Sequence, residues 1–149
     1  MDLLIGEYRN TLDEKGRILF PAKLRGILNK NELIVTKGLD HCLMLFTSED
    51  WAALSDKIMK KASPFNDQTN KVIRRFIAPA QQLEFDRSGR LSIPQSLREY
   101  ASLSGESVIL GLTRYMELWD SKCYDEYLAS KETDVKDAAG SMSDIFLSS

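Results

Sequence analysis

The sequence predicts a mainly β fold of the α+β class, built from two tandem copies of one small module. Three observations predict it. The stretch Leu12–Arg25 returns as Phe85–Arg98 at a constant offset of 73 positions. The match continues without an insertion to Ser48 and Ser121, which indicates a duplicated folding unit. Both copies consist of short apolar runs interrupted by Gly and Pro. The matched pairs of the opening stretch are Asp13 and Asp86, Gly16 and Gly89, Arg17 and Arg90, Pro21 and Pro94, Leu24 and Leu97, and Arg25 and Arg98.

The chain has 149 residues, so each copy is small for an independent domain. Units of this size bury little apolar surface by themselves. We therefore expect the two copies to associate pseudo-symmetrically in a β-barrel-like core, and we expect association between chains.

The first copy begins with a predicted strand at 4–12, followed by a tight turn and a return strand at 17–20. Asp13 can open a type I turn, and Gly16 can take the left-handed position three residues later. This is the chemistry of a short hairpin loop with a bulge. The second copy repeats it with Asp86 and Gly89.

A proline ends each return strand. Pro21 is followed by apolar residues at helical spacing, which predicts a short helix at 22–28, and Pro94 begins the same arrangement in the second copy. Further strands and helices then follow in both copies. We expect strands at 33–36, 42–46, 107–110 and 115–119, and helices that begin near Ser48 and Ser121.

These patterns divide the chain into a first repeat at 6–54, a helical connector at 55–79, a second repeat at 80–127 and a tail at 128–149. The connector is amphipathic, with six bases against two acids, and Pro64 interrupts it. The tail is polar and rich in small residues, so we expect partial disorder, with Ile145, Phe146 and Leu147 docking weakly.

Composition excludes several classes of protein. The formal net charge of −2 argues against a uniformly basic nucleic-acid binder. No run is apolar and long enough to span a bilayer, and the N-terminal residues do not resemble a secretion signal, so we expect a cytoplasmic protein. Cys42 and Cys123 are not equivalent in the two repeats, and His41 is the single histidine. We therefore expect reduced structural thiols, no metal site and no cofactor.

Three segments carry a family resemblance: GEYRNTLDEKGRILFPAKLR, FDRSGRLSIPQSLREYA and VILGLTRYMELWD. From about Gly6 to Tyr127 the chain resembles the MraZ family of bacterial transcriptional regulators, which is linked to the division and cell wall gene cluster. The resemblance implies two AbrB-like (SpoVT-AbrB, swapped-hairpin) halves, a ring-shaped homo-oligomer, most simply an octamer, and a nucleoid-associated regulator. It also implies binding to short direct repeats of double-stranded DNA upstream of its own operon.

The candidate DNA-binding residues lie in the two turns. Arg17 and Arg90 can each present a planar fork of donors to a phosphate or to a guanine edge, and Lys15 and Arg87 add charge at the turn tips. A structural alternative is that each arginine only pairs with the aspartate of its own turn, Asp13 or Asp86. Both can hold if the carboxylate keeps the arginine aimed until DNA arrives.

Other residues carry weaker expectations. Gly16 and Gly89 serve a positive φ and not a ligand contact. Arg25, Arg98, Arg74 and Arg75 are candidates for secondary phosphate contacts, although a solvated helix face or an ion pair explains them as well.

The leading hypothesis is a sequence-specific DNA-binding transcriptional regulator, most simply a repressor. The alternative is an oligomeric protein-interaction module, antitoxin-like, in which the turn arginines meet carboxylates of a protein. An aspartate-dyad hydrolase is a third option, but an arginine beside each of Asp13 and Asp86 favours two ionised carboxylates over a shared proton. We therefore do not expect an enzyme.

Overall fold

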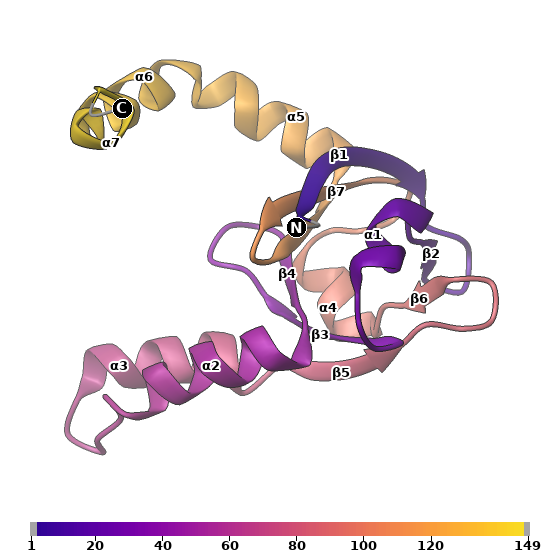
Figure 1. The fold of residues 1–149 in the computed structure, drawn as a ribbon, viewed down its shortest axis with the longest axis horizontal. Coiled ribbons are helices and arrows are strands. Elements are labelled where there is room, and N and C mark those ends of the chain that lie inside the picture. The colour runs from indigo at the N-terminus through magenta and orange to yellow at the C-terminus, as the bar shows by residue number, and fades with distance from the viewer. Residues whose placement is uncertain (1–2, 148–149) are drawn as a thin grey trace.

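A computed structural model describes residues 3–147 of the chain, without the side chain of Leu147. Its strands form a six-stranded antiparallel sheet and a separate two-stranded ribbon, with helices at the periphery (Figure 1). The sheet has the order β1-β7-β8-β4-β3-β5, and the ribbon pairs β2 with β6. The strands are β1 Leu4–Thr11, β2 Arg17–Leu19, β3 Glu32–Lys37, β4 Leu43–Phe46, β5 Gln81–Glu84, β6 Arg90–Ser92, β7 Glu106–Thr113 and β8 Met116–Asp120.

The helices follow the predicted repeat. A proline precedes α1 and α4 at the same place in each copy, and capping side chains of Thr47 and Asp120 accept hydrogen bonds at the starts of α2 and α5. The helices are α1 Ala22–Ile27, α2 Ser48–Met59, α3 Asp67–Val72, the π-helical turn η1 Ile73–Ile77, α4 Gln95–Tyr100, α5 Ser121–Ser130, α6 Glu132–Ser141 and α7 Ser143–Leu147.

The two repeats are intertwined in the sheet. β1 of the first repeat pairs with β7 of the second, and β5 of the second pairs with β3 of the first. In the middle, β4 pairs with β8, its equivalent in the other repeat. Each copy therefore completes the other's sheet, which is the pseudo-symmetric association that the small size of each repeat predicts.

The return strands differ from the simple hairpin that the turns predict. β2 does not form a ladder with β1. It pairs with β6 of the other repeat, with Ile18 opposite Leu91 at the centre. The reason is length: a three-residue strand that ends at a proline offers few ladder hydrogen bonds, and pairing the two equivalent strands buries Ile18 and Leu91 completely.

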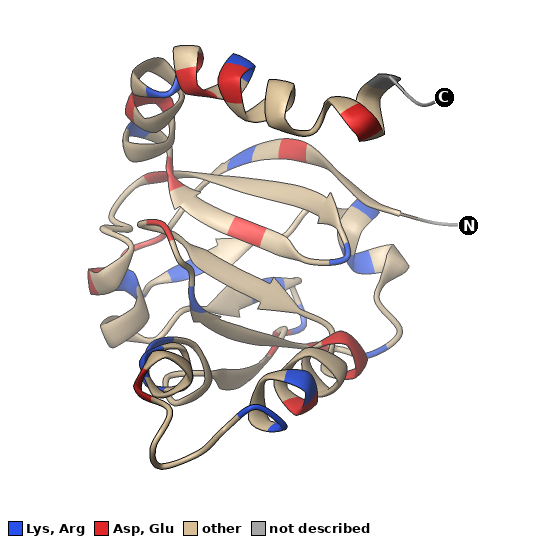
Figure 2. Cartoon of the chain, turned by 90° about the vertical axis from the view of Figure 1, so that its left-hand side faces the viewer, with Lys and Arg blue, Asp and Glu red and all other residues tan. Residues whose placement is uncertain are grey.

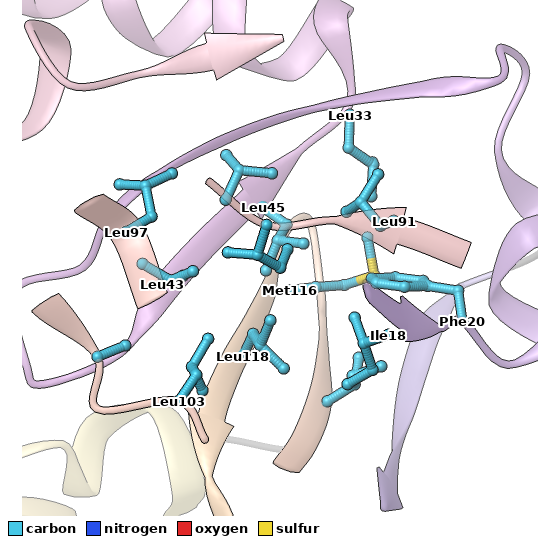
Figure 3. Packing of buried hydrophobic residues seen from close by; sticks show 14 of the residues in the cluster. Ile18, Phe20, Leu33, Leu43, Leu45, Leu91, Leu97, Leu103, Met116 and Leu118 are labelled. Atoms are coloured by element: carbon cyan, nitrogen blue, oxygen red, sulfur yellow. The ribbon is translucent and has the colours of Figure 1, made fainter. Parts of the chain in front are cut away.

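The main core lies between this ribbon and the sheet. Figure 3 shows Ile18, Phe20 and Leu91 of the ribbon side packed against Met116 and Leu118 of the sheet. Phe20 and Phe85, one from each repeat, meet edge to face with ring centroids 5.2 Å apart. Both repeats therefore contribute side chains to this shared main core.

The described strands do not close into a barrel. β1 and β5 lie at the two ends of the six-stranded sheet, and no pairing joins them within residues 3–147. The established architecture is therefore mixed α+β with an antiparallel sheet, and the barrel-like core stays a prediction.

The connector is helical, as its amphipathic pattern predicts. α2 and α3 lie side by side and project from the sheet (Figure 1). Phe76 of η1 is buried against Phe46 and Trp51. Val72, at the end of α3, is 41% exposed and does not join this cluster. Over the face that the projecting helices present, basic and acidic residues are interspersed (Figure 2).

The tail differs from the expected partial disorder, because α6 and α7 occupy residues 132–147. Glu132, Lys136, Ala138 and Ala139 favour this helix, while the other four residues at 132–139 have lower helix propensity. The expected docking of Ile145 and Phe146 is not seen, since these side chains are 68% and 63% exposed. The side chain of Leu147 lies outside the described part.

We predict that the close approach of β1 to β7 makes any side chain at Gly111 destabilising. A Cβ on Gly111 would lie 2.8 Å from the backbone N and Cα of Ile5, and backbone in a paired strand cannot move away cheaply. Gly111→Ala should lower the free energy of unfolding by about 1–3 kcal/mol in urea titrations. Gly105→Ala is the control, since nothing lies within 4 Å of its added Cβ. Equal effects of the two substitutions would contradict this account.

Candidate nucleic-acid interface

The two turns that precede β2 and β6 have the same geometry. In the first, the Asp13 N–H donates to the Arg17 carbonyl at 2.9 Å, and the Gly16 N–H donates to the Asp13 carbonyl at 3.0 Å. Gly16 has φ +79°, and its equivalent Gly89 has φ +81°. Both glycines therefore occupy the left-handed region, as the sequence predicts.

Each aspartate holds its turn with both carboxylate oxygens. Asp13 Oδ1 accepts from the backbone N–H groups of Lys15 and Arg17, both at 2.9 Å. Its Oδ2 accepts from Arg17 Nε at 2.7 Å. These bonds, the backbone N–H of Arg17 first among them, lower the pKa of Asp13 below its ordinary value.

The second turn repeats this pattern. Asp86 Oδ1 accepts from the N–H groups of Ser88 and Arg90, and its Oδ2 accepts from Arg90 Nε at 2.8 Å. The pKa of Asp86 is lowered for the same reasons. The predicted pairing of each turn arginine with its own aspartate is therefore present in both repeats.

This pairing uses only the Nε donor of each arginine side chain. The aspartate binds each guanidinium through Nε, and among residues 3–147 no hydrogen-bond partner is found for the Nη atoms of Arg17 or Arg90. The side chains of Arg17 and Arg90 are 27% and 34% exposed. Each turn thus holds a guanidinium in one orientation and leaves its terminal donors available.

The β2–β6 ribbon brings the two arginines onto one face. Arg17 pairs with Ser92, and Arg90 pairs with Leu19. The central residues Ile18 and Leu91 are buried, so their neighbours on either side point outward. Arg17 and Arg90 are diagonal neighbours across the ribbon, with Cα atoms about 7–8 Å apart by this register.

The turn tips extend this face. Lys15 and Arg87 are exposed, and the register places them beyond opposite ends of the ribbon. The ribbon lies on the opposite side of the molecule from α2 and α3 (Figure 1). We call this surface the basic ribbon face; it consists of Lys15, Arg17, Leu19, Arg87, Arg90 and Ser92.

The basic ribbon face suits a phosphate-bearing groove. A two-stranded β-ribbon fits the major groove of B-DNA, where an arginine fork can bind a guanine edge or a phosphate. Pre-oriented guanidinium groups lose less conformational entropy on binding than free ones.

Two candidate phosphate-contact residues lie elsewhere than expected. The sequence predicts solvated helix faces or ion pairs for Arg25 and Arg98, but both are half-buried. Arg25 Nε donates to the Phe20 carbonyl at 3.2 Å, and Arg98 Nε donates to the Ile93 carbonyl at 2.9 Å. Both guanidinium groups lie directly against the turn glycines.

The connector arginines are not part of the basic ribbon face. Arg75 lies over the ring of Tyr100, 4.7 Å from its centroid, and donates to the Tyr100 hydroxyl. Arg74 is exposed on η1. The structure therefore does not bring either of them together with Arg17 and Arg90.

A family model described as "MraZ protein, putative antitoxin-like" matches residues 3–75 and again residues 76–145. The chain belongs to the MraZ family. A Treponema denticola protein named transcriptional regulator MraZ is 52% identical over 142 residues, which are 95% of this chain and 99% of the relative. Relatives of the same name from Treponema pallidum and Halothermothrix orenii are 43% and 40% identical, over 95% and 96% of this chain and 95% and 99% of their own lengths. The double match of the MraZ model agrees with the repeat seen in the sequence.

The geometry separates the two aspartates of the dyad hypothesis. Asp13 and Asp86 precede opposite ends of the ribbon, and each carboxylate is bound within its own turn. A shared-proton pair is therefore not formed. Within the described residues there is no group of three or more His, Cys, Asp or Glu side chains arranged to hold a metal, and no helix long and apolar enough to cross a membrane.

Sequence reasoning missed three residues of this region. Leu19, 47% exposed, and Ser92 lie on the basic ribbon face directly opposite Arg90 and Arg17, and strict alternation with buried Ile18 and Leu91 was the available signal. Asn10 of β1 donates through Nδ2 to the Leu19 carbonyl at 2.7 Å, which ties the ribbon to the sheet. No sequence pattern indicated that hydrogen bond.

We predict that the turns make the fold sensitive to acid. The pKa values of Asp13 and Asp86 are lowered in the folded state, so the unfolded chain binds more protons. Their contribution is present above the ordinary carboxyl pKa of about 4 and is lost as the pH falls through the lowered folded value. In urea titrations, the parent should have a higher free energy of unfolding at pH 7 than the double variant Asp13→Asn/Asp86→Asn, and this difference should shrink towards pH 3. A difference that stays constant would contradict this.

Proposed function

We propose that this protein is a DNA-binding transcriptional regulator, most simply a repressor of its own division and cell wall operon, and that the basic ribbon face reads the DNA. The observation that carries the proposal is the placement of Arg17 and Arg90 on one outward face, each aimed by an aspartate and each with free terminal donors. The names of the relatives as transcriptional regulators support the same function.

The residues of the basic ribbon face have two different roles in this proposal. Arg17 and Arg90 reach base edges or adjacent phosphates, and the exposed Lys15 and Arg87 neutralise phosphates beyond either end of the ribbon. Base contacts give sequence specificity, while phosphate contacts give register and salt dependence.

Assembly supplies the affinity that a single chain lacks. The chain has a pI of about 5.5, so long-range attraction to DNA is weak. We propose a ring-shaped homo-oligomer, an octamer in the simplest case, that carries one basic ribbon face per subunit and binds short direct repeats as a nucleoid-associated, cytoplasmic regulator. Simultaneous contacts on one duplex raise the effective concentration of each further contact.

The intertwined pairing supports the related proposal on fold type. Exchange of strands between repeats, with β1 on β7, β5 on β3 and β2 on β6, is what two AbrB-like halves of swapped-hairpin type would give. A pseudo-symmetric, barrel-like core would follow from that arrangement.

The description of the family as antitoxin-like favours one second candidate, an oligomeric protein-interaction module. In that case the basic ribbon face binds carboxylates of a protein partner. Capture of one stoichiometric partner that survives nuclease treatment, with no preference among DNA sequences, would favour it.

We predict that Arg17→Ala and Arg90→Ala each weaken binding to DNA from upstream of the gene by about 1–3 kcal/mol for every base that the arginine reads. If the arginine binds phosphate instead, the slope of log affinity against log salt falls by about 0.9. Fluorescence anisotropy against a scrambled duplex, across a salt series, measures both.

Arg9→Ala is the matched control. Arg9 has 35% side-chain exposure and forms ion pairs with Asp125 at 2.9 Å, Glu106 at 3.6 Å and Glu7 at 3.8 Å, so its removal deletes the same charge away from the ribbon. If Arg9→Ala weakens DNA binding as much as Arg90→Ala, net charge and not the basic ribbon face governs affinity.

We also predict that a duplex with several direct repeats binds at least about a hundredfold more tightly than a duplex with one, because the subunits bind together. Titration of duplexes of equal length with one, two or three repeats tests this. Equal affinity for all three would rule out avidity as the source of binding.

A further inference from the structure

Each of the turns that carry Arg17 and Arg90 is covered by an arginine of the other repeat. Arg25 of the first repeat lies on Gly89 of the second, close enough that a Cβ on Gly89 would be 2.5 Å from Arg25 Cζ. Arg98 of the second repeat lies on Gly16 of the first, where an added Cβ would be 2.6 Å from Arg98 Nε. The guanidinium groups therefore occupy the space that only glycine leaves open.

Backbone hydrogen bonds lock each arginine in this position. Arg25 Nε donates to the Phe20 carbonyl at 3.2 Å, and the Phe20 N–H donates to the Gly89 carbonyl at 3.1 Å. A single residue, Phe20, thus binds both the arginine and the glycine beneath it.

The reciprocal network has the same form. Arg98 Nε donates to the Ile93 carbonyl at 2.9 Å, and the Ile93 N–H donates to the Gly16 carbonyl at 2.9 Å. Both turn glycines are buried under these arginines, although their turns project towards solvent. The arrangement is therefore specific in geometry and occurs twice.

We infer that Arg25 and Arg98 are cross-repeat positioning residues: Arg25 sets the turn that presents Arg90, and Arg98 sets the turn that presents Arg17. They act through the turns and not by touching DNA. This inference rests on the proposed function for its consequence in DNA binding. The contact of each arginine with the turn of the other repeat, which we call the cross-repeat clamp, is a property of the free protein.

Substitution by lysine separates clamping from phosphate binding. Lysine keeps the charge but lacks the planar group and the Nε donor that the network uses. A phosphate contact would survive Arg25→Lys largely intact, with an unchanged salt slope. If Arg25 instead positions the turn, Arg25→Lys should remove its contact with the turn as fully as Arg25→Ala does.

The first experiment measures hydrogen exchange of the full-length protein without DNA. Arg25→Lys should speed exchange in the second turn, 86–90, and leave the first turn, 13–17, as in the parent. Arg98→Lys should do the reverse, and each variant is the control for the other. Faster exchange in the turn of the substituted repeat itself, in both turns equally, or in neither would overturn the cross-repeat clamp.

The second experiment is a pair of double-mutant cycles in DNA affinity. Arg25→Lys alone should weaken specific binding about threefold to tenfold, the size of one or two backbone hydrogen bonds. It should have little further effect in an Arg90→Ala background, yet should multiply with Arg17→Ala, although Arg17 is the nearer residue in sequence.

Coupling to Arg17 instead of Arg90 would overturn the inference. If the exchange results hold but Arg90→Ala itself leaves DNA binding unchanged, the clamp stands and the proposed role of the ribbon in DNA binding fails. The two failures are thereby told apart.

Discussion

The pairing of β2 with β6 is the interaction on which the rest of the structure depends. Two strands of three residues each would not persist alone in water. They persist because Ile18 and Leu91 are completely buried against the sheet and because Phe20 and Ile93 each bond to the turn of the other repeat. This short ladder therefore adds to the cross-repeat pairings of the sheet, covers the core and fixes the spacing of the two turn arginines.

The same duplication explains how a slightly acidic chain presents a basic surface. Each turn uses a carboxylate to hold a guanidinium, so the net charge of a turn stays small. What the aspartate provides is direction, since it binds Nε and leaves the terminal donors outward. For recognition at close range, oriented donors matter more than the total charge, which acts mainly on the rate of approach.

The sequence predicts the local turns and helix starts, but it does not predict which strand pairs with which. The turns, the proline stops and the glycines at positive φ follow from residue type, and the structure has them all. The pairing of β2 with β6 does not follow, because an alternating pattern assigns residues to faces but does not name the neighbouring strand. The sequence places Arg25 and Arg98 on helix faces for the same reason: their packing partners lie in the other repeat, outside any local window.

The repeat offset contains more information than local pattern alone. A residue that recurs at the same place in both copies has a similar environment in each. When the two repeats pack pseudo-symmetrically, part of that environment is supplied by the opposite repeat. Arg25 and Arg98 recur together with Gly16 and Gly89, and the structure shows that these four positions form two equivalent contacts across the repeats. A helix-surface arginine present in both copies beside a buried glycine is thus a signal of packing between copies. The duplicated turn, with its aspartate, its glycine and two arginines, is therefore one structural unit, and each such unit draws its four residues from both repeats.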